Sequence, residues 1–81
     1  MEVRITRSAR KHRIGAAHIL SALAAAGPPD EDDDALIYVG TDDRGVELEI
    51  VVVRDDRYTD QPERLAIIHV MPTAYRDREQ P

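Results

Sequence analysis

The chain has 81 residues, contains no cysteine, tryptophan or phenylalanine, and carries a formal net charge of −5 at pH 7. This length fits one domain with a small core, and the missing cysteines exclude disulfides, thiolate metal sites and a cysteine nucleophile. No apolar run approaches the roughly 20 residues that span a bilayer, so we expect a cytoplasmic protein with no membrane partner.

Positive charge is concentrated at the start of this acidic chain. Residues 1–13 hold five basic side chains and one acid, a charge of +4, so the rest of the chain must carry −9. The basic residues are Arg4, Arg7, Arg10, Lys11 and Arg13. Most of them fall in residues 7–13, which we call the basic segment. A local positive field suits a polyanion such as RNA or an acidic partner protein.

Two helices are expected in residues 1–27, the basic helical part of the chain. Residues 3–5 can begin as a short strand or an extended arm, and Thr6 is placed to cap a first short helix over the basic segment. A break at Gly15 separates it from a second helix, which the alanines of residues 14–26 favour.

The second helix carries a compact apolar stripe of Ile19, Leu20 and Leu23, the face expected against the rest of the fold. Gly27 suits a residue with positive φ at the helix end, and the two prolines after it stop further winding. His18 lies on the face away from this stripe, so we interpret it as a structural or interfacial residue.

Strand-like segments make up the second half of the chain. The acidic side chains of residues 30–34 repel one another and predict a solvated loop over residues 28–35. An antiparallel β meander is expected over residues 36–72, with strands at 36–39, 46–53 and 65–71, and a short tail follows at 73–81. Apolar and acidic side chains alternate in the middle strand, and the Asp-Asp-Arg-Gly sequence before it favours a hairpin.

These elements predict an α+β fold in a single domain over residues 1–81. Two N-terminal helices are expected to pack on one face of a three-stranded antiparallel sheet. The sheet becomes four-stranded if residues 3–5 add an edge strand.

Three segments carry a resemblance to a known family. They are the basic run at 6–14 (TRSARKHRI), the hairpin at 40–53 (GTDDRGVELEIVVV) and the last strand with its tail at 67–76 (IIHVMPTAYR). In this order they resemble the small BrnT-like toxins of type II toxin–antitoxin systems, which have a RelE-like ribonuclease fold. The resemblance implies a toxin that cleaves mRNA, either ribosome-associated or free. It also implies a cognate antitoxin as partner. The chain is then expected to form either a homodimer or a toxin–antitoxin hetero-oligomer.

RNA cleavage without a metal ion needs a base for the 2′-hydroxyl, an acid for the leaving oxygen and cations for the charge that grows at phosphorus. The residues expected in these catalytic roles are His12, His69, Arg10, Tyr75 and Arg76. The residues expected to bind RNA phosphates are Arg7, Arg10, Lys11 and Arg13. The three histidines lack the spacing of a zinc site, so we expect no metal and no cofactor.

The catalytic candidates also have simpler structural interpretations. His69 alternates with Leu65, Ile67 and Met71, so it can equally be a hydrogen-bonded core or edge histidine. His12 can equally be a residue on a helix surface. The sequence alone leaves both alternatives open.

The basic segment has three interpretations. Its cations can pair within the chain, with the acidic residues 30–34 or with Glu47 and Glu49, although such surface pairs stabilise a fold by only about 0–1 kcal/mol. They can instead bind phosphates, or they can dock on an acidic protein. In the last case the chain is a non-catalytic protein-binding module or an inactive toxin homologue.

Overall fold

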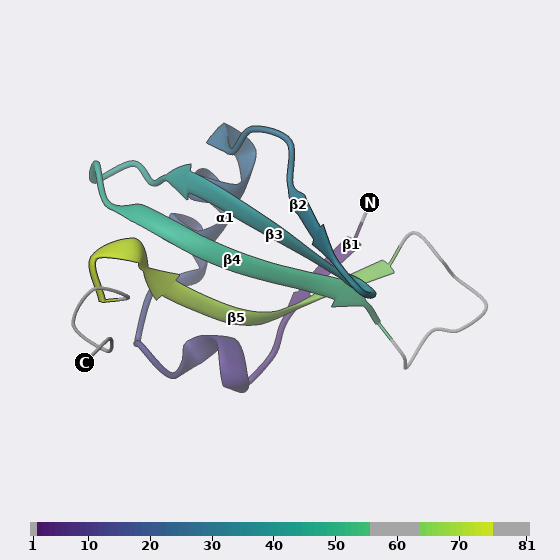
Figure 1. Ribbon diagram of the computed structural model, residues 1–81. Coiled ribbons are helices and arrows are strands. Elements are labelled where there is room, and N and C mark those ends of the chain that lie inside the picture. The colour runs from purple at the N-terminus through teal and green to yellow at the C-terminus, as the bar shows by residue number, and fades with distance from the viewer. Residues whose placement is uncertain (1, 56–63, 76–81) are drawn as a thin grey trace.

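The computed structural model describes residues 2–55 and 64–75, and Figure 1 shows them as a twisted sheet with one helix against one of its faces. The elements are β1 (Glu2–Ile5), the 3-10 helix η1 (Ser8–Arg10), α1 (Ala16–Ala25), β2 (Asp30–Asp32), β3 (Ala35–Thr41), β4 (Glu47–Arg54) and β5 (Arg64–Pro72). Within these ranges, no helix is long and apolar enough to cross a membrane.

The strands form a five-stranded mixed sheet in the order β1-β5-β4-β3-β2. β1 runs parallel to β5, with Ile5 opposite Ile67, and the other neighbouring strands are antiparallel. The chain is an α+β fold, but the predicted antiparallel sheet of three or four strands carrying two helices is wrong. Parallel pairing joins segments from the two ends of the chain, and the apolar pattern within a strand does not identify its partner.

β4 lies at the centre of the sheet and supplies much of the core. Leu48, Ile50 and Val52 alternate with more exposed residues and are buried on the face that α1 covers, which we call the inner face. The rest of the buried cluster consists of Ile19 and Ala22 of α1, Ala9 of η1, and Ile67 and Val70 of β5. The opposite, outer face is left open by α1 (Figure 1).

α1 corresponds to the second predicted helix, but its buried face differs from the predicted stripe. Ile19 and Ala22 are buried, whereas Leu20 is 46% exposed. Burying the small Ala22 brings the backbone of α1 close to the sheet. The helix gives way to extended backbone at Ala26, and Gly27 does not adopt positive φ, because a residue before proline is restricted toward extended conformations.

The predicted first helix over residues 7–13 is wrong, because only the three residues of η1 form a helix there. A longer α-helix would place Arg7 beside Lys11 at i,i+4, where like charges repel. Arg13 adopts a left-handed backbone with φ of 57°, and this conformation cannot continue a right-handed helix. The basic segment is therefore a succession of tight turns.

The predicted acidic loop over residues 28–35 is wrong at its centre, where β2 forms an edge strand. Asp30 lies opposite Ile37, and the chain turns into β3 through Asp33, whose φ is 53°. All three side chains of β2 are exposed. The backbone of β2 can therefore pair with β3 while the mutually repelling carboxylates stay in water, and a charged edge resists pairing with other chains.

Gly40 allows the close contact between β3 and α1. It is buried, and a Cβ atom at this position would overlap the carbonyl oxygen of Ala22 and lie 3.1 Å from the Cα atom of Ala26. Both neighbours are backbone atoms, one within α1 and one at its C-cap, and backbone cannot rotate away as a side chain could. The packing of α1 on the sheet therefore requires glycine here.

We expect Gly40→Ala to lower the free energy of unfolding by about 1–3 kcal/mol, because the added methyl group must push α1 away from the core. Urea denaturation of the purified variant measures this loss. Gly27→Ala is the matched control, because a Cβ atom there meets nothing within 4 Å. Equal stability of the Gly40→Ala variant and the wild type would contradict the close helix packing.

Candidate active site

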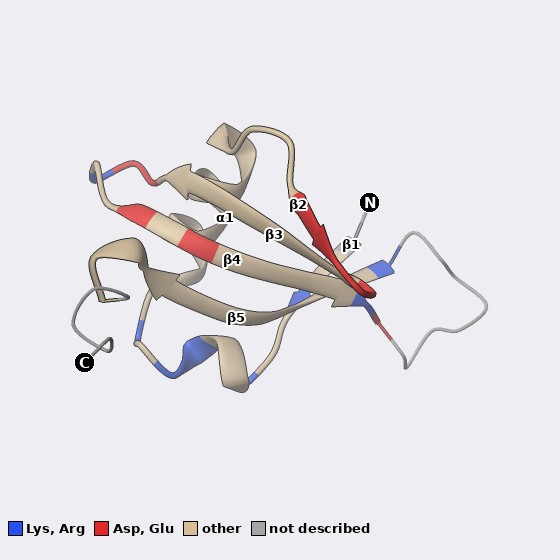
Figure 2. Ribbon diagram, in the orientation of Figure 1, with Lys and Arg blue, Asp and Glu red and all other residues tan. Residues whose placement is uncertain are grey.

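The basic segment lies along the edge of β5, because β1 pairs only with the first part of that strand. Beyond β1, Thr6 stays attached to β5. Its backbone N–H and its hydroxyl both donate to the carbonyl oxygen of Ile67, at 3.0 and 2.8 Å. The same hydroxyl accepts a hydrogen bond from the N–H of Ala9 at 3.3 Å, and Ala9 is fully buried. These contacts hold η1 beside β5 and place its positive charge there (Figure 2).

A register shift in β5 turns His69 to the outer face. Ile67 lies opposite Val52 but His69 lies opposite Val51, so one residue between them is a bulge. Because directly opposite residues share a face, Ile67 points into the core and His69 points away from it. The expected alternation of His69 with Ile67 on one face is therefore wrong. With its side chain 38% exposed, His69 is not a core histidine.

Three aromatic rings meet near the end of β5. The ring centroid of His12 lies 6.4 Å from that of His69 and 5.6 Å from that of Tyr75, with interplanar angles of 89° and 73°. Such edge-to-face pairs typically stabilise by about 0.5–1.5 kcal/mol each. His12, His69 and Tyr75, three of the residues expected in catalysis, thus form one group, which we call the ring cluster.

Glu49 belongs to this site, although the sequence did not single it out for catalysis. Its Oε2 atom lies 3.6 Å from Nε2 of His69, and its side chain is only 18% exposed. A carboxylate in this place can orient the imidazole, as an acidic residue does for the histidine of a catalytic triad. The alternation within β4 placed Glu49 on a polar face, but only the register of β5 identifies His69 as its neighbour.

The four expected RNA-binding residues are exposed and lie near the ring cluster in the chain. They are Arg7, Arg10, Lys11 and Arg13. Among residues 2–55 and 64–75, none of the four forms an ion pair with an acidic side chain. The acidic β2 lies at the opposite edge of the sheet from β1. The expected pairing of these cations with residues 30–34, Glu47 or Glu49 is therefore not formed.

Arg4 differs from the other arginines near the start of the chain. Its Nε and Nη2 atoms donate to the two carboxylate oxygens of Asp55, at 2.9 and 3.2 Å. Asp55 is only 2% exposed, and the pair links β1 to the end of β4 across β5. Arg4 therefore supports the fold. Arg76 lies outside the described residues, so its catalytic role stays a prediction.

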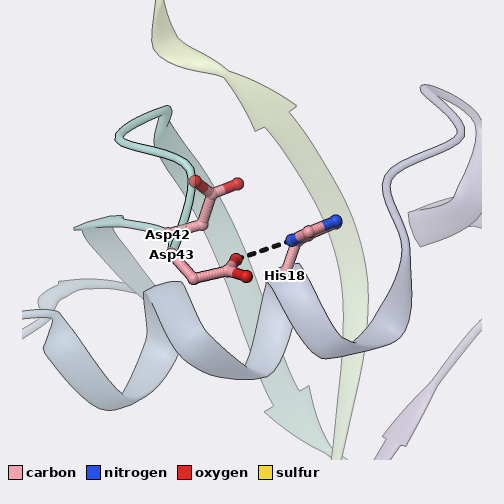
Figure 3. A group of neighbouring side chains, drawn as sticks. All are labelled: His18, Asp42 and Asp43. Atoms are coloured by element: carbon pink, nitrogen blue, oxygen red, sulfur yellow. Dashed lines mark hydrogen bonds and ion pairs between the residues drawn. The ribbon is translucent and has the colours of Figure 1, made fainter.

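The turn between β3 and β4 brings His18, Asp42 and Asp43 together (Figure 3). Nδ1 of His18 lies 2.6 Å from Oδ1 of Asp43. The carboxylate of Asp42 is already engaged, because it accepts hydrogen bonds from the N–H groups of Arg44 and Val46 and from the Arg44 guanidinium. Two groups remain available, too few for a structural zinc site. The trio therefore joins α1 to the turn rather than forming a metal site.

The pKa of Asp42 lies below its ordinary value. Burial alone raises this pKa. The hydrogen bond from the Arg44 side chain, those from the N–H groups of Val46 and Arg44, and the charge of the guanidinium outweigh the effect of burial. The ionised carboxylate of Asp42 is therefore more stable in the folded protein than in the unfolded chain. Asp42 thus stabilises the fold when it is ionised.

The contribution of Asp42 to the free energy of unfolding is expected to be complete at neutral pH and to disappear under acid. As pH falls below the ordinary value of 3.8, the unfolded chain takes up its proton first, which shifts the equilibrium toward unfolding. Denaturation curves from about pH 6 to about pH 2 should show a smaller loss for Asp42→Asn than for the wild type. Asp34→Asn is the control at an exposed acid. Parallel curves for the wild type and Asp42→Asn would contradict this role.

Comparison with known proteins finds no matching family model, no matching curated protein and no matching solved structure. The resemblance to BrnT-like toxins therefore stays a prediction. What can be said about function depends on the geometry of the ring cluster and on the cations around it.

Proposed function

We propose that this protein cleaves RNA without a metal ion, as the toxin of a toxin–antitoxin pair. The observation that supports this most strongly is the contact of His12 with His69 and Tyr75, beside cations that have no acidic partner among the described residues. Two imidazoles can serve as the base and the acid of one reaction. The cations can hold the phosphates on either side of the cleaved bond.

In the proposed reaction the 2′-oxygen of a ribose attacks the neighbouring phosphorus atom. One imidazole of the ring cluster removes the 2′-hydroxyl proton while the other gives a proton to the 5′-oxygen as its bond to phosphorus breaks. The products are a 2′,3′-cyclic phosphate and a free 5′-hydroxyl. Lys11 is the neighbour of His12 in the chain and can stabilise the extra negative charge of the transition state.

The supporting residues position the two imidazoles. The carboxylate of Glu49 lies 3.6 Å from Nε2 of His69, and its charge can fix the orientation of that ring. Tyr75 packs against the ring of His12 and limits its rotation. Glu49 and Tyr75 are therefore positioning residues in this proposal.

We expect His12→Ala and His69→Ala each to lower the rate of RNA cleavage by about 10²–10⁴-fold, the usual contribution of a general acid or base. Cleavage of a labelled RNA oligonucleotide in the presence of a chelator measures the rate. A matched oligonucleotide that lacks the 2′-hydroxyl groups should stay intact. His18→Ala is the control, because that histidine pairs with Asp43 on another part of the surface.

Two results would contradict the proposed cleavage. One is intact RNA at high concentrations of the wild-type protein. The other is equal loss of activity in His18→Ala and His12→Ala, because the ring cluster would then have no special role.

Glu49→Gln should change the pH dependence of the cleavage rate, because Glu49 lies beside His69. Glu47→Gln is the control and should change it less, because Glu47 accepts a hydrogen bond from Thr73 instead.

A non-catalytic binding module is the second candidate function, and the exposed cations of the basic segment favour it. Arg7 and Lys11 are exposed and have no acidic partner among residues 2–55 and 64–75. An acidic surface of a partner such as the cognate antitoxin can dock on them. Intact RNA together with tight binding of an acidic partner, lost in Arg7→Gln, would favour the module or an inactive toxin homologue.

A further inference from the structure

A hollow lies between the basic segment and the start of α1. Its volume is about 280 Å³. It is lined by Ile5, Arg10, Arg13, Ile14, Gly15, Ala16 and Ile19. The lining thus combines two arginine residues with an apolar floor and includes no acidic residue. This size lies near the lower end of the range for ligand pockets, roughly 300–1,000 Å³.

A tight turn brings the two arginines to the same hollow. The N–H of Arg13 donates to the carbonyl oxygen of Arg10 at 3.0 Å, which closes residues 10–13. Arg13 has the left-handed φ of 57°, a conformation that costs energy for a residue other than glycine and that concentrates at functional sites. His12 belongs to the same turn and contacts the ring cluster, so the turn connects the hollow with the proposed catalytic residues.

The hollow carries positive charge that the described part of the chain leaves without a counter-charge. Neither Arg10 nor Arg13 has an acidic partner among residues 2–55 and 64–75. α1 starts at the hollow with Gly15 as its N-cap, without a side-chain cap or an acidic residue in its first turn. The positive end of the helix dipole therefore adds to the field of the two guanidinium groups.

We propose that this hollow binds one nucleotide, with its phosphate between Arg10 and Arg13 and its base on the floor of Ile5 and Ile14. The inference rests on the proposed function in one respect, that this nucleotide is the neighbour of the one cleaved at the ring cluster. An RNA strand then crosses the turn of residues 10–13, with one phosphate in the hollow and the next beside His12.

Titration of the full chain with adenosine 5′-monophosphate tests this proposal, with adenosine and inorganic phosphate as separate probes. The nucleotide should bind more tightly than either probe and should shift the backbone amide resonances of Gly15 and Ala16. Arg10→Gln and Arg13→Gln should each weaken its binding roughly tenfold, the loss of one charge-assisted hydrogen bond. Arg54→Gln, at the far end of β4, is the matched control and should bind as the wild type does.

The result that overturns the proposal is nucleotide binding that is absent, or that is equal in the wild type, Arg10→Gln and Arg13→Gln. An unchanged melting temperature shows that the variants are folded. His12→Ala separates the two proposals, because it should bind the nucleotide normally and yet cleave RNA about 10²–10⁴-fold more slowly than the wild type. If the wild type does not cut RNA but its nucleotide binding depends on Arg13, cleavage fails and the hollow stands. The opposite pattern rejects the hollow and keeps cleavage.

Discussion

The parallel pairing of β1 with β5 determines where the basic segment lies. β1 pairs with residues 64–67, and Thr6 extends the attachment by donating two hydrogen bonds to the carbonyl oxygen of Ile67. The ion pair of Arg4 with the buried Asp55 holds the same strand to β4. Because β1 stops there, the next part of β5 is left for η1. Without this arrangement, His12 would have no fixed position relative to His69.

The bulge in β5 is the second condition for the site. It places Ile67 in the core and His69 on the outer face within two residues, so the same strand can support the core and present an imidazole. Glu49 is available beside that imidazole because β4 alternates between the two faces. Glu49 of β4, His69 of β5, His12 of the basic segment and Tyr75 just after β5 thus form the site. α1 stabilises the other face of the sheet through the contact at Gly40.

Local patterns predicted the elements whose structure is determined locally. The alternation at residues 46–53 identified β4, the alanines identified α1, and the Asp-Asp-Arg-Gly sequence identified the turn between β3 and β4. One failure involves distant segments, because nothing in residues 2–5 specifies β5 as a parallel partner. Two failures are local. Residues 7–13 form only η1 and not a longer helix, and the acidic composition of β2 gave no sign of its pairing with the adjacent β3. The chemistry of their side chains identified His12, His69 and Tyr75 as catalytic candidates. The face of the sheet on which His69 lies could not be predicted, because it depends on a bulge that periodicity does not reveal.

The nuclear Overhauser spectrum of the full chain in solution tests the position of the basic segment most directly. The rings of His12 and Tyr75 have centroids 5.6 Å apart, so their protons should give cross-peaks, as should those of His12 and His69. The amide of Thr6 should also exchange slowly, because it donates to Ile67. Cross-peaks across β4 and β5 without any from the His12 ring to His69 or Tyr75 would contradict the account, because the sheet would then be folded while the basic segment was detached from β5.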